Sequence, residues 1–234
     1  MIQDAPDPAA AARLAGPFPV DPAVLAAIRP MEARDAPQVA RLHHASMGRS
    51  LWARLGLPFL ETLYEVLLDS PRFLAFVYEE GARVRGFIAG STDTPAMYRE
   101  VGRAHTPRLA MQAARRVWRD PGALVLLHQT SRYFEASGSD IPAESLFCSF
   151  EPDLRGTRVS GHINKVLFDD LRSRGHRYVK VTTEVDNPGS NRQLAHWGFV
   201  VDRRFTFYGK TMVRYVLDLE ASPRVEPVGR HPAV

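Results

Sequence analysis

The feature that most constrains the fold is residues 144–170, which read as a buried strand, a short turn and an amphipathic helix. The strand is a short apolar run that contains Leu146, Phe147, Cys148 and Phe150. The helix carries one apolar face, formed by Ile163, Val166, Leu167 and Leu171. A helix that begins with small residues presents unpaired N–H groups and the positive end of its dipole. The sequence of residues 155–161, between the strand and the helix, therefore predicts an anion-binding turn.

The composition indicates a globular protein with a mild positive charge. The 234 residues are 45% hydrophobic and 24% charged, so a single domain of moderate size is the simplest expectation. The net charge of +4 is too small to favour nucleic acid as a partner, although it suits an anionic ligand. Cys148 is the only cysteine, which excludes an intramolecular disulfide and a cysteine-based zinc site, and we expect no metal. Its place in an apolar run predicts a packed thiol rather than a nucleophile.

Neither a membrane span nor an export signal is visible in the sequence. No apolar run approaches the roughly 20 residues that a spanning helix needs. The first 20 residues are acidic and rich in Ala and Pro, and they lack the basic start and hydrophobic core of a secretory signal. We therefore expect a cytoplasmic protein without membrane contacts.

The order of predicted elements indicates an α/β (α+β) domain over residues 27–220. Residues 1–26 are expected to form a flexible arm or a loosely docked helix, and residues 221–234 a Pro-rich tail. Before the opening stretch, the patterns predict a strand, two helices and a hairpin at 28–31, 33–47, 58–68 and 73–88. Residues 93–143 are too long for a structureless loop and predict a helical insertion, with a helix at 107–119. After it, the patterns predict a strand at 177–185, and a turn at 186–191 that leads into a short helix ending at Trp197 with Gly198 as its C-cap. Two strands are predicted at 200–208 and 212–219.

Three local patterns in this order resemble the GNAT superfamily of acyl-CoA-dependent N-acyltransferases. They are the stretch from Pro152 to Arg155-Gly156 before a helix that closes at Gly175, Asn187 eleven residues before Gly198, and residues 207–212 before the last strand. The resemblance covers roughly residues 28–219. It implies one domain with a mixed, largely antiparallel sheet of about seven strands, flanked by helices and splayed between strands 4 and 5. The insertion would then lie between strands 3 and 4.

The sequence departs from the family signature within the anion-binding turn. In the register set by Arg155, the two glycines of the signature are replaced by Arg158 and Ser160, and Gly161 comes one position late. Glycines at these positions let a pyrophosphate approach the backbone closely. Arg158 keeps the amide and adds a cation that can pair with phosphate, but its side chain can equally fill the groove.

The resemblance implies acetyl-CoA as the cosubstrate and assigns a set of site residues. Glu144 is the candidate general base, and its alternative is an exposed carboxylate at a strand start. The position of the usual acid is Leu194, so Tyr208 is the substitute candidate, unless it is an aromatic packed between strands. Asn187 and Ser190 are expected to contact the cofactor, unless they only cap a helix. The expected cofactor-binding residues are Phe150, Glu151, Arg155, Gly156, Thr157, Arg158, Val159, Ser160, Gly161, Asn187 and Ser190, with the oxyanion donor near Phe150 or Glu151.

The leading functional hypothesis is acetyl transfer from acetyl-CoA to a primary amine of a small molecule, by direct attack with general-base assistance. The alternative is a non-catalytic acyl-CoA-binding or regulatory module, motivated by the lost glycines and the missing Tyr. We expect the protein to act as a monomer or a homodimer. The acceptor amine and the length of the acyl chain are left open by the sequence.

Overall fold

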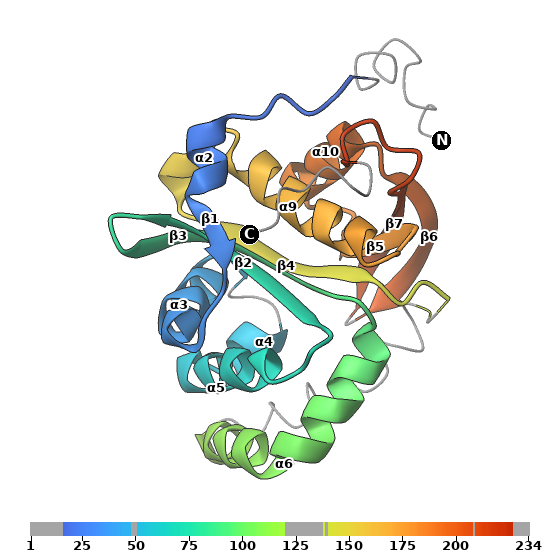
Figure 1. Ribbon diagram of the computed structural model, residues 1–234. Helices are drawn as coiled ribbons and strands as arrows, with labels where there is room; N and C mark the ends of the chain where they lie inside the picture. Colours follow the sequence, from blue (N-terminus) through green and yellow to red (C-terminus); the bar gives the residue numbers. More distant parts are fainter. Residues whose placement is uncertain (1–15, 48–50, 120–137, 139, 208, 227–234) are drawn as a thin grey trace.

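The computed structural model describes residues 16–47, 51–119, 138, 140–207 and 209–226 of the chain. Seven strands form one mixed sheet in the order β1-β2-β3-β4-β5-β7-β6 (Figure 1). The strands are β1 (Ile28–Pro30), β2 (Phe73–Glu80), β3 (Arg83–Ser91), β4 (Glu144–Phe150), β5 (Tyr178–Glu184), β6 (Val200–Phe207) and β7 (Lys210–Asp218). All neighbouring pairs are antiparallel except β4 and β5. The expected seven-stranded, largely antiparallel sheet is confirmed.

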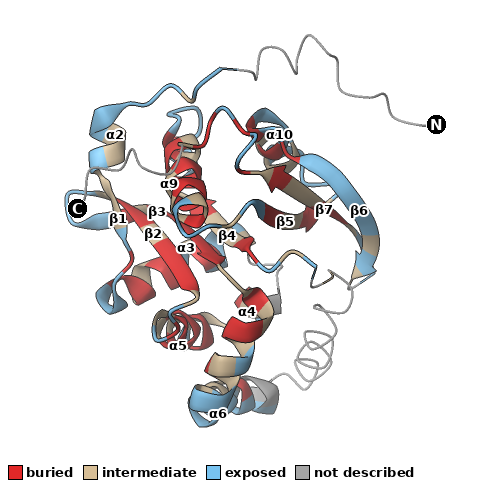
Figure 2. Cartoon of the chain, turned by 45° about the vertical axis from the view of Figure 1, so that its right-hand side comes forward, coloured by how far each residue is buried: buried red, intermediate tan, exposed pale blue. Residues whose placement is uncertain are grey.

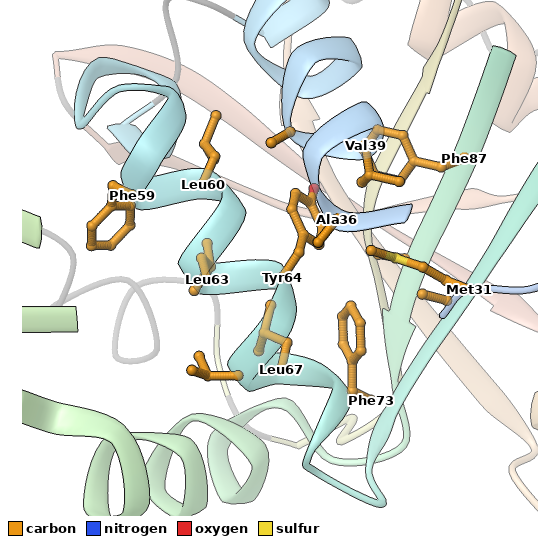
Figure 3. Packing of buried hydrophobic residues seen from close by; sticks show 14 of the residues in the cluster. Met31, Ala36, Val39, Phe59, Leu60, Leu63, Tyr64, Leu67, Phe73 and Phe87 are labelled. Carbon is orange, nitrogen blue, oxygen red and sulfur yellow. The ribbon is translucent and has the colours of Figure 1, made fainter. Parts of the chain in front are cut away.

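Helices cover both faces of this sheet, and each face has its own hydrophobic core. The helices and helical turns are α2 (Pro22–Ala26), η1 (Ala33–Asp35), α3 (Ala36–Met47), α4 (Leu51–Arg54), α5 (Leu57–Leu68), α6 (Thr94–Arg119), η2 (Pro152–Leu154), α9 (Val159–Ser173) and α10 (Pro188–Trp197). One core joins α3, α5 and the start of α6 to β2 and β3, and α5 points its leucines and Tyr64 into it (Figure 3). The second core lies under α9 and α10. Burial is accordingly concentrated on the sheet and on the inner sides of these helices (Figure 2).

The feature that positions the site is the separation of β4 from β5. These parallel strands pair only at Glu144↔Lys180 and Ser145↔Val181, at the start of β4. Beyond that point β4 continues to pair with β3, whereas β5 pairs with β7 along its whole length. A register shift in the β3–β4 ladder leaves Leu146 as an extra residue on β4, and such a bulge bends the strand that contains it. The predicted splay between the fourth and fifth strands is therefore confirmed.

The insertion between β3 and β4 begins with a longer helix than the sequence predicts. The sequence places a helix at 107–119, but α6 starts at Thr94 and contains Pro107 in its interior. Asp93 caps this start, because its side chain accepts a hydrogen bond from the N–H of Ala96 at 3.0 Å. Met97 and Val101 then bury one face of the first turns in the core shared with α5, and this packing holds the helix despite the proline. Residues 120–137 of the insertion lie outside the described residues.

The described parts of both chain ends are packed against the domain. In residues 1–26 the structure describes residues 16–26, which contain the short helix α2, capped by the Asp21 side chain. In the expected tail, residues 221–226 lie along α9, where Val225 is buried. Arg172 donates to the carbonyl of Val225 at 3.0 Å, and the N–H of Glu226 donates to Asp169 at 2.8 Å. Among the described helices, none is long and apolar enough to cross a bilayer.

Candidate active site

The turn after β4 has the backbone shape of a glycine-containing anion loop. Gly156 has φ +83° and Arg158 has φ +65°, a left-handed conformation that L side chains adopt only at a cost. Arg158 is also the N-cap residue of α9, and its side chain makes no capping hydrogen bond. The amides of the first turn, from Val159 to Gly161, therefore keep the unpaired donors of a helix N-terminus. The backbone shape that a glycine would favour is retained although the residue is arginine.

A histidine locks this turn in place. The carbonyl of Arg158 accepts the N–H of His162 at 3.1 Å and lies 2.9 Å from His162 Nδ1. The N–H of Asp21 donates to His162 Nε2 at 2.7 Å. Because Nε2 is an acceptor here, the proton lies on Nδ1 and is donated to the carbonyl. His162 thus joins the N-terminal segment to the anion-binding turn.

A cavity of 460 Å³ opens beside the start of α9. It is lined by residues 16–19, Arg158, Ser160, Gly161, Gln193, His196, Trp197 and Arg224. Two arginines and a histidine face this space, and the described lining includes no carboxylate. The site therefore suits an anionic group next to helix donors.

An aromatic side chain from the N-terminal segment covers part of the turn. Phe18 stacks on Trp197 with ring centroids 5.2 Å apart and meets the edge of His162 at 5.0 Å. A Cβ atom at Gly161 would lie 2.8 Å from Cζ of Phe18, closer than real Cβ atoms come to any neighbour. Gly161, one position late for the family signature, therefore makes room for Phe18.

At the closed end of the splay lies a buried ion pair. Glu144 and Lys180 are each 1% exposed, and Lys180 Nζ lies 3.8 Å from Glu144 Oε2. Lys180 also donates to the carbonyl of Gly138 at 2.7 Å, from the far end of the insertion. Burial lowers the pKa of Lys180, and the charge of Glu144 opposes that shift. The alternative that Glu144 is an exposed carboxylate is wrong.

Tyr98 on α6 is close enough to this pair to respond to its charge. Burial, followed by the negative charge of Glu144, raises the pKa of the Tyr98 phenol, so it is protonated at neutral pH. No local pattern in the sequence indicates Tyr98 or Lys180, since both are brought to this site only by the sheet and the insertion. Tyr208, the expected acid, lies outside the described residues. Leu194, at the position of the family's acid, is buried in the second core.

The N–H groups of the two expected oxyanion donors, Phe150 and Glu151, point in opposite directions. The N–H of Glu151 already donates to the carbonyl of Arg85 at 2.8 Å, so it is not available to bind an oxyanion. Its carboxylate is also occupied, by Arg83 and Arg85. N–H groups alternate in direction along an antiparallel strand, so the N–H of Phe150 points away from β3 and toward the splay. Of the two expected donors, only Phe150 has an N–H directed into the splay.

The other expected cofactor residues divide between the cavity and local structure. Arg158, Ser160 and Gly161 line the cavity, whereas Val159 is buried and Thr157 bonds to the carbonyl of Leu154 at 2.7 Å. Arg155, Gly156, Asn187 and Ser190 are outside the described lining.

Two further expectations concern local roles downstream and within β4. Asn187 caps α10 by accepting the N–H of Ser190 at 3.2 Å, as the capping alternative predicts. Gly198 closes the helix with φ +86°, which confirms the predicted C-cap. Cys148 packs against the second core and burial raises the pKa of its thiol to about 12, which confirms the packed thiol.

Comparison with solved structures identifies the fold. A GNAT-family acetyltransferase from Desulfovibrio desulfuricans matches 82% of this chain and 98% of its own, with a TM-score of 0.55 and 12% identity. The protein SsHAT matches 82% and 98% of the two chains with a TM-score of 0.59 and 18% identity. The ribosomal-protein-S18-alanine N-acetyltransferase from Escherichia coli matches 88% and 98% with a TM-score of 0.51 and 11% identity. No protein-family model and no curated protein sequence matches the chain. The chain thus has the GNAT acetyltransferase fold, as the resemblance implied.

Proposed function

We propose that this protein is an N-acetyltransferase that moves an acetyl group from acetyl-CoA to a primary amine of a small molecule. The observation that carries the proposal is one continuous arrangement along β4. At one end of this strand lie the helix donors and the basic cavity, and at the other lies the buried carboxylate of Glu144. Seven residues at ~3.3 Å each span roughly 20 Å, which a thin extended chain can cover along the splayed strands.

Each part of this arrangement has a task in acyl transfer. The amine nitrogen attacks the thioester carbonyl carbon, the C–S bond breaks, and the sulfur leaves as a thiolate. Glu144 accepts the proton that the attacking nitrogen gives up, and Lys180 keeps this buried carboxylate paired when it is ionised. The N–H of Phe150 also faces the splay, but six residues of extended strand, roughly 20 Å, separate it from Glu144, so a single reacting carbonyl cannot contact both.

Binding of acetyl-CoA is the first test. Titration calorimetry and thermal unfolding with acetyl-CoA should show a 1:1 complex and a rise in Tm, because a ligand that binds only the folded state stabilises it. Pantetheine, which lacks the nucleotide phosphates, is the matched control and should stabilise far less. No stabilisation at millimolar acetyl-CoA would contradict the proposal.

A non-catalytic acyl-CoA-binding module is the second candidate, favoured by the burial of Glu144. This carboxylate is 1% exposed and already paired with Lys180, so an incoming amine must displace or join that contact. The two candidates separate in a turnover assay: the module binds acetyl-CoA but transfers no acetyl group across a broad panel of amines.

A further inference from the structure

We infer that Arg224 is a phosphate-binding residue, which the C-terminal segment brings to the cavity at the start of α9. This inference rests on the proposed function, under which the phosphate belongs to the nucleotide end of CoA. Arg224 lies in residues 221–234, which the sequence predicts to be a tail, and it is separated from Arg158 by 66 positions. Both arginines line the same cavity.

The guanidinium of Arg224 is buried without the partners that a buried charge requires. The residue is 6% exposed, and its Nε and Nη1 atoms are buried with no hydrogen-bond partner. Burial lowers the pKa of Arg224, and no described carboxylate opposes the shift. Isolating a charge from water in this way is costly unless a counter-charge compensates it. An anion in the adjoining cavity would supply that compensation.

The surroundings of Arg224 reinforce the need for an anion. Burial and the charge of Arg224 together lower the pKa of His196, which lines the same cavity. Arg158 adds a second full positive charge, and the first turn of α9 adds the positive end of its dipole. Two carboxylates beside this segment are engaged elsewhere: Asp169 pairs with Lys165 at 2.9 Å, and Glu226 lies 3.5 Å from the same amine. A phosphate oxygen between the two arginines would form charge-assisted hydrogen bonds with both.

The segment is held by contacts that do not involve the Arg224 guanidinium. Lys165 donates to the Arg224 carbonyl at 3.3 Å, Arg172 to the Val225 carbonyl at 3.0 Å, and the Glu226 N–H to Asp169 at 2.8 Å. The side chain can therefore be changed while the segment remains anchored. The unpaired nitrogens of the Arg224 guanidinium take part in none of these contacts, so we assign them to binding of an anion.

Titration calorimetry on Arg224→Gln tests the assignment. The variant should bind CoA about tenfold to a hundredfold more weakly than the wild type, as expected for losing charged hydrogen bonds. Arg224→Lys should recover part of this loss, because it restores the charge without the bidentate geometry. Arg174→Gln, the same change in charge at the opposite end of α9, should bind as the wild type does. Thermal unfolding of each variant verifies the fold.

The choice of ligand separates this inference from the proposed function. With dephospho-CoA as the titrant, an equal loss in Arg224→Gln assigns the contact to the pyrophosphate, and no loss assigns it to the 3′-phosphate. If the wild type fails to bind CoA but binds inorganic pyrophosphate, and Arg224→Gln does not, the anion site stands and the acetyltransferase proposal falls. A folded Arg224→Gln protein that binds CoA and pyrophosphate with wild-type affinity overturns the inference, and so does a wild type that binds neither.

Discussion

At the scale of single residues, the pair of Glu144 and Lys180 is the feature with the largest consequences. Taking two charges out of water is expensive, and their attraction repays this only with good geometry and further hydrogen bonds. Here the separation of 3.8 Å is long, although Lys180 also donates a hydrogen bond to the Gly138 carbonyl. Such a pair contributes little stability by itself, so its burial at the end of the splay is better explained by chemistry than by folding.

Replacing Glu144 tests that chemistry. If Glu144 is the general base, Glu144→Gln should lower kcat about a hundredfold and remove the rise of kcat with pH, while the KM for acetyl-CoA stays similar. Glu65→Gln is the control, since Glu65 forms an exposed pair with Arg108 on the surface of α5. A folded Glu144→Gln protein with unchanged kcat and pH profile would remove Glu144 from the base role. Lys180→Met complements the experiment, because a purely structural pair predicts the same defect from either partner.

Arg158 shows what the sequence could and could not predict about one residue. The signature register places a glycine at this position, and the backbone there has the left-handed conformation that a glycine favours. Whether its side chain blocks a groove or faces a ligand depends on neighbours from α10 and the C-terminal segment. Those neighbours are distant in the sequence, so local pattern could not decide between the two alternatives.

At the scale of elements, the segment that precedes α2 covers part of the anion-binding turn. Phe18 occupies the space beside Gly161 and is fixed by Trp197 on one side and His162 on the other. The Asp21 N–H anchors the same segment to His162. A group that approaches the backbone at Gly161 therefore meets the Phe18 ring first. Binding close to the first turn of α9 requires this ring to move.

Removing that ring should strengthen cofactor binding. Phe18→Ala should bind CoA about threefold to tenfold more tightly, because the ligand no longer displaces a stacked pair worth about 0.5–1.5 kcal/mol. The free protein should unfold at a slightly lower temperature, since the same contacts are lost. Calorimetry and thermal unfolding measure both effects, with the exposed Val20→Ala in the same segment as control. Weaker binding by Phe18→Ala would instead make Phe18 a wall of the site.

At the scale of the whole molecule, the sequence predicted what depends on local periodicity and missed what depends on contacts between distant segments. The strands and α9 follow from alternating or helical apolar patterns and are predicted nearly in full, whereas the splay is what the family resemblance implies. The predicted helix begins at Pro107, but packing of Met97 and Val101 against distant segments starts α6 at Thr94 and carries the helix through the proline. The docking of the N-terminal segment depends on a hydrogen bond between residues 141 positions apart, which no local pattern encodes.

A buried arginine links the far end of the insertion to the sheet. Because its partner is a carboxylate, the free energy of unfolding should depend on pH in the acidic range. Arg214 is fully buried and binds both oxygens of Asp140, at 2.7 and 2.9 Å, while also binding Asp202 on β6. The hydrogen bonds from Arg214 lower the pKa of Asp140 to about 2, against about 3.9 in an unfolded chain. Because the folded pKa is the lower one, the stabilisation is complete above about pH 4 and is lost as the pH falls through 2.

Asp140 is 55% exposed, so screening reduces the contribution of this pair to about 1 kcal/mol. Asp140→Asn should therefore lower the free energy of unfolding by about 1 kcal/mol at pH 7 and by almost nothing at pH 2, measured in urea. An equal difference at both pH values would show that the carboxylate's charge is not what holds the insertion to β7.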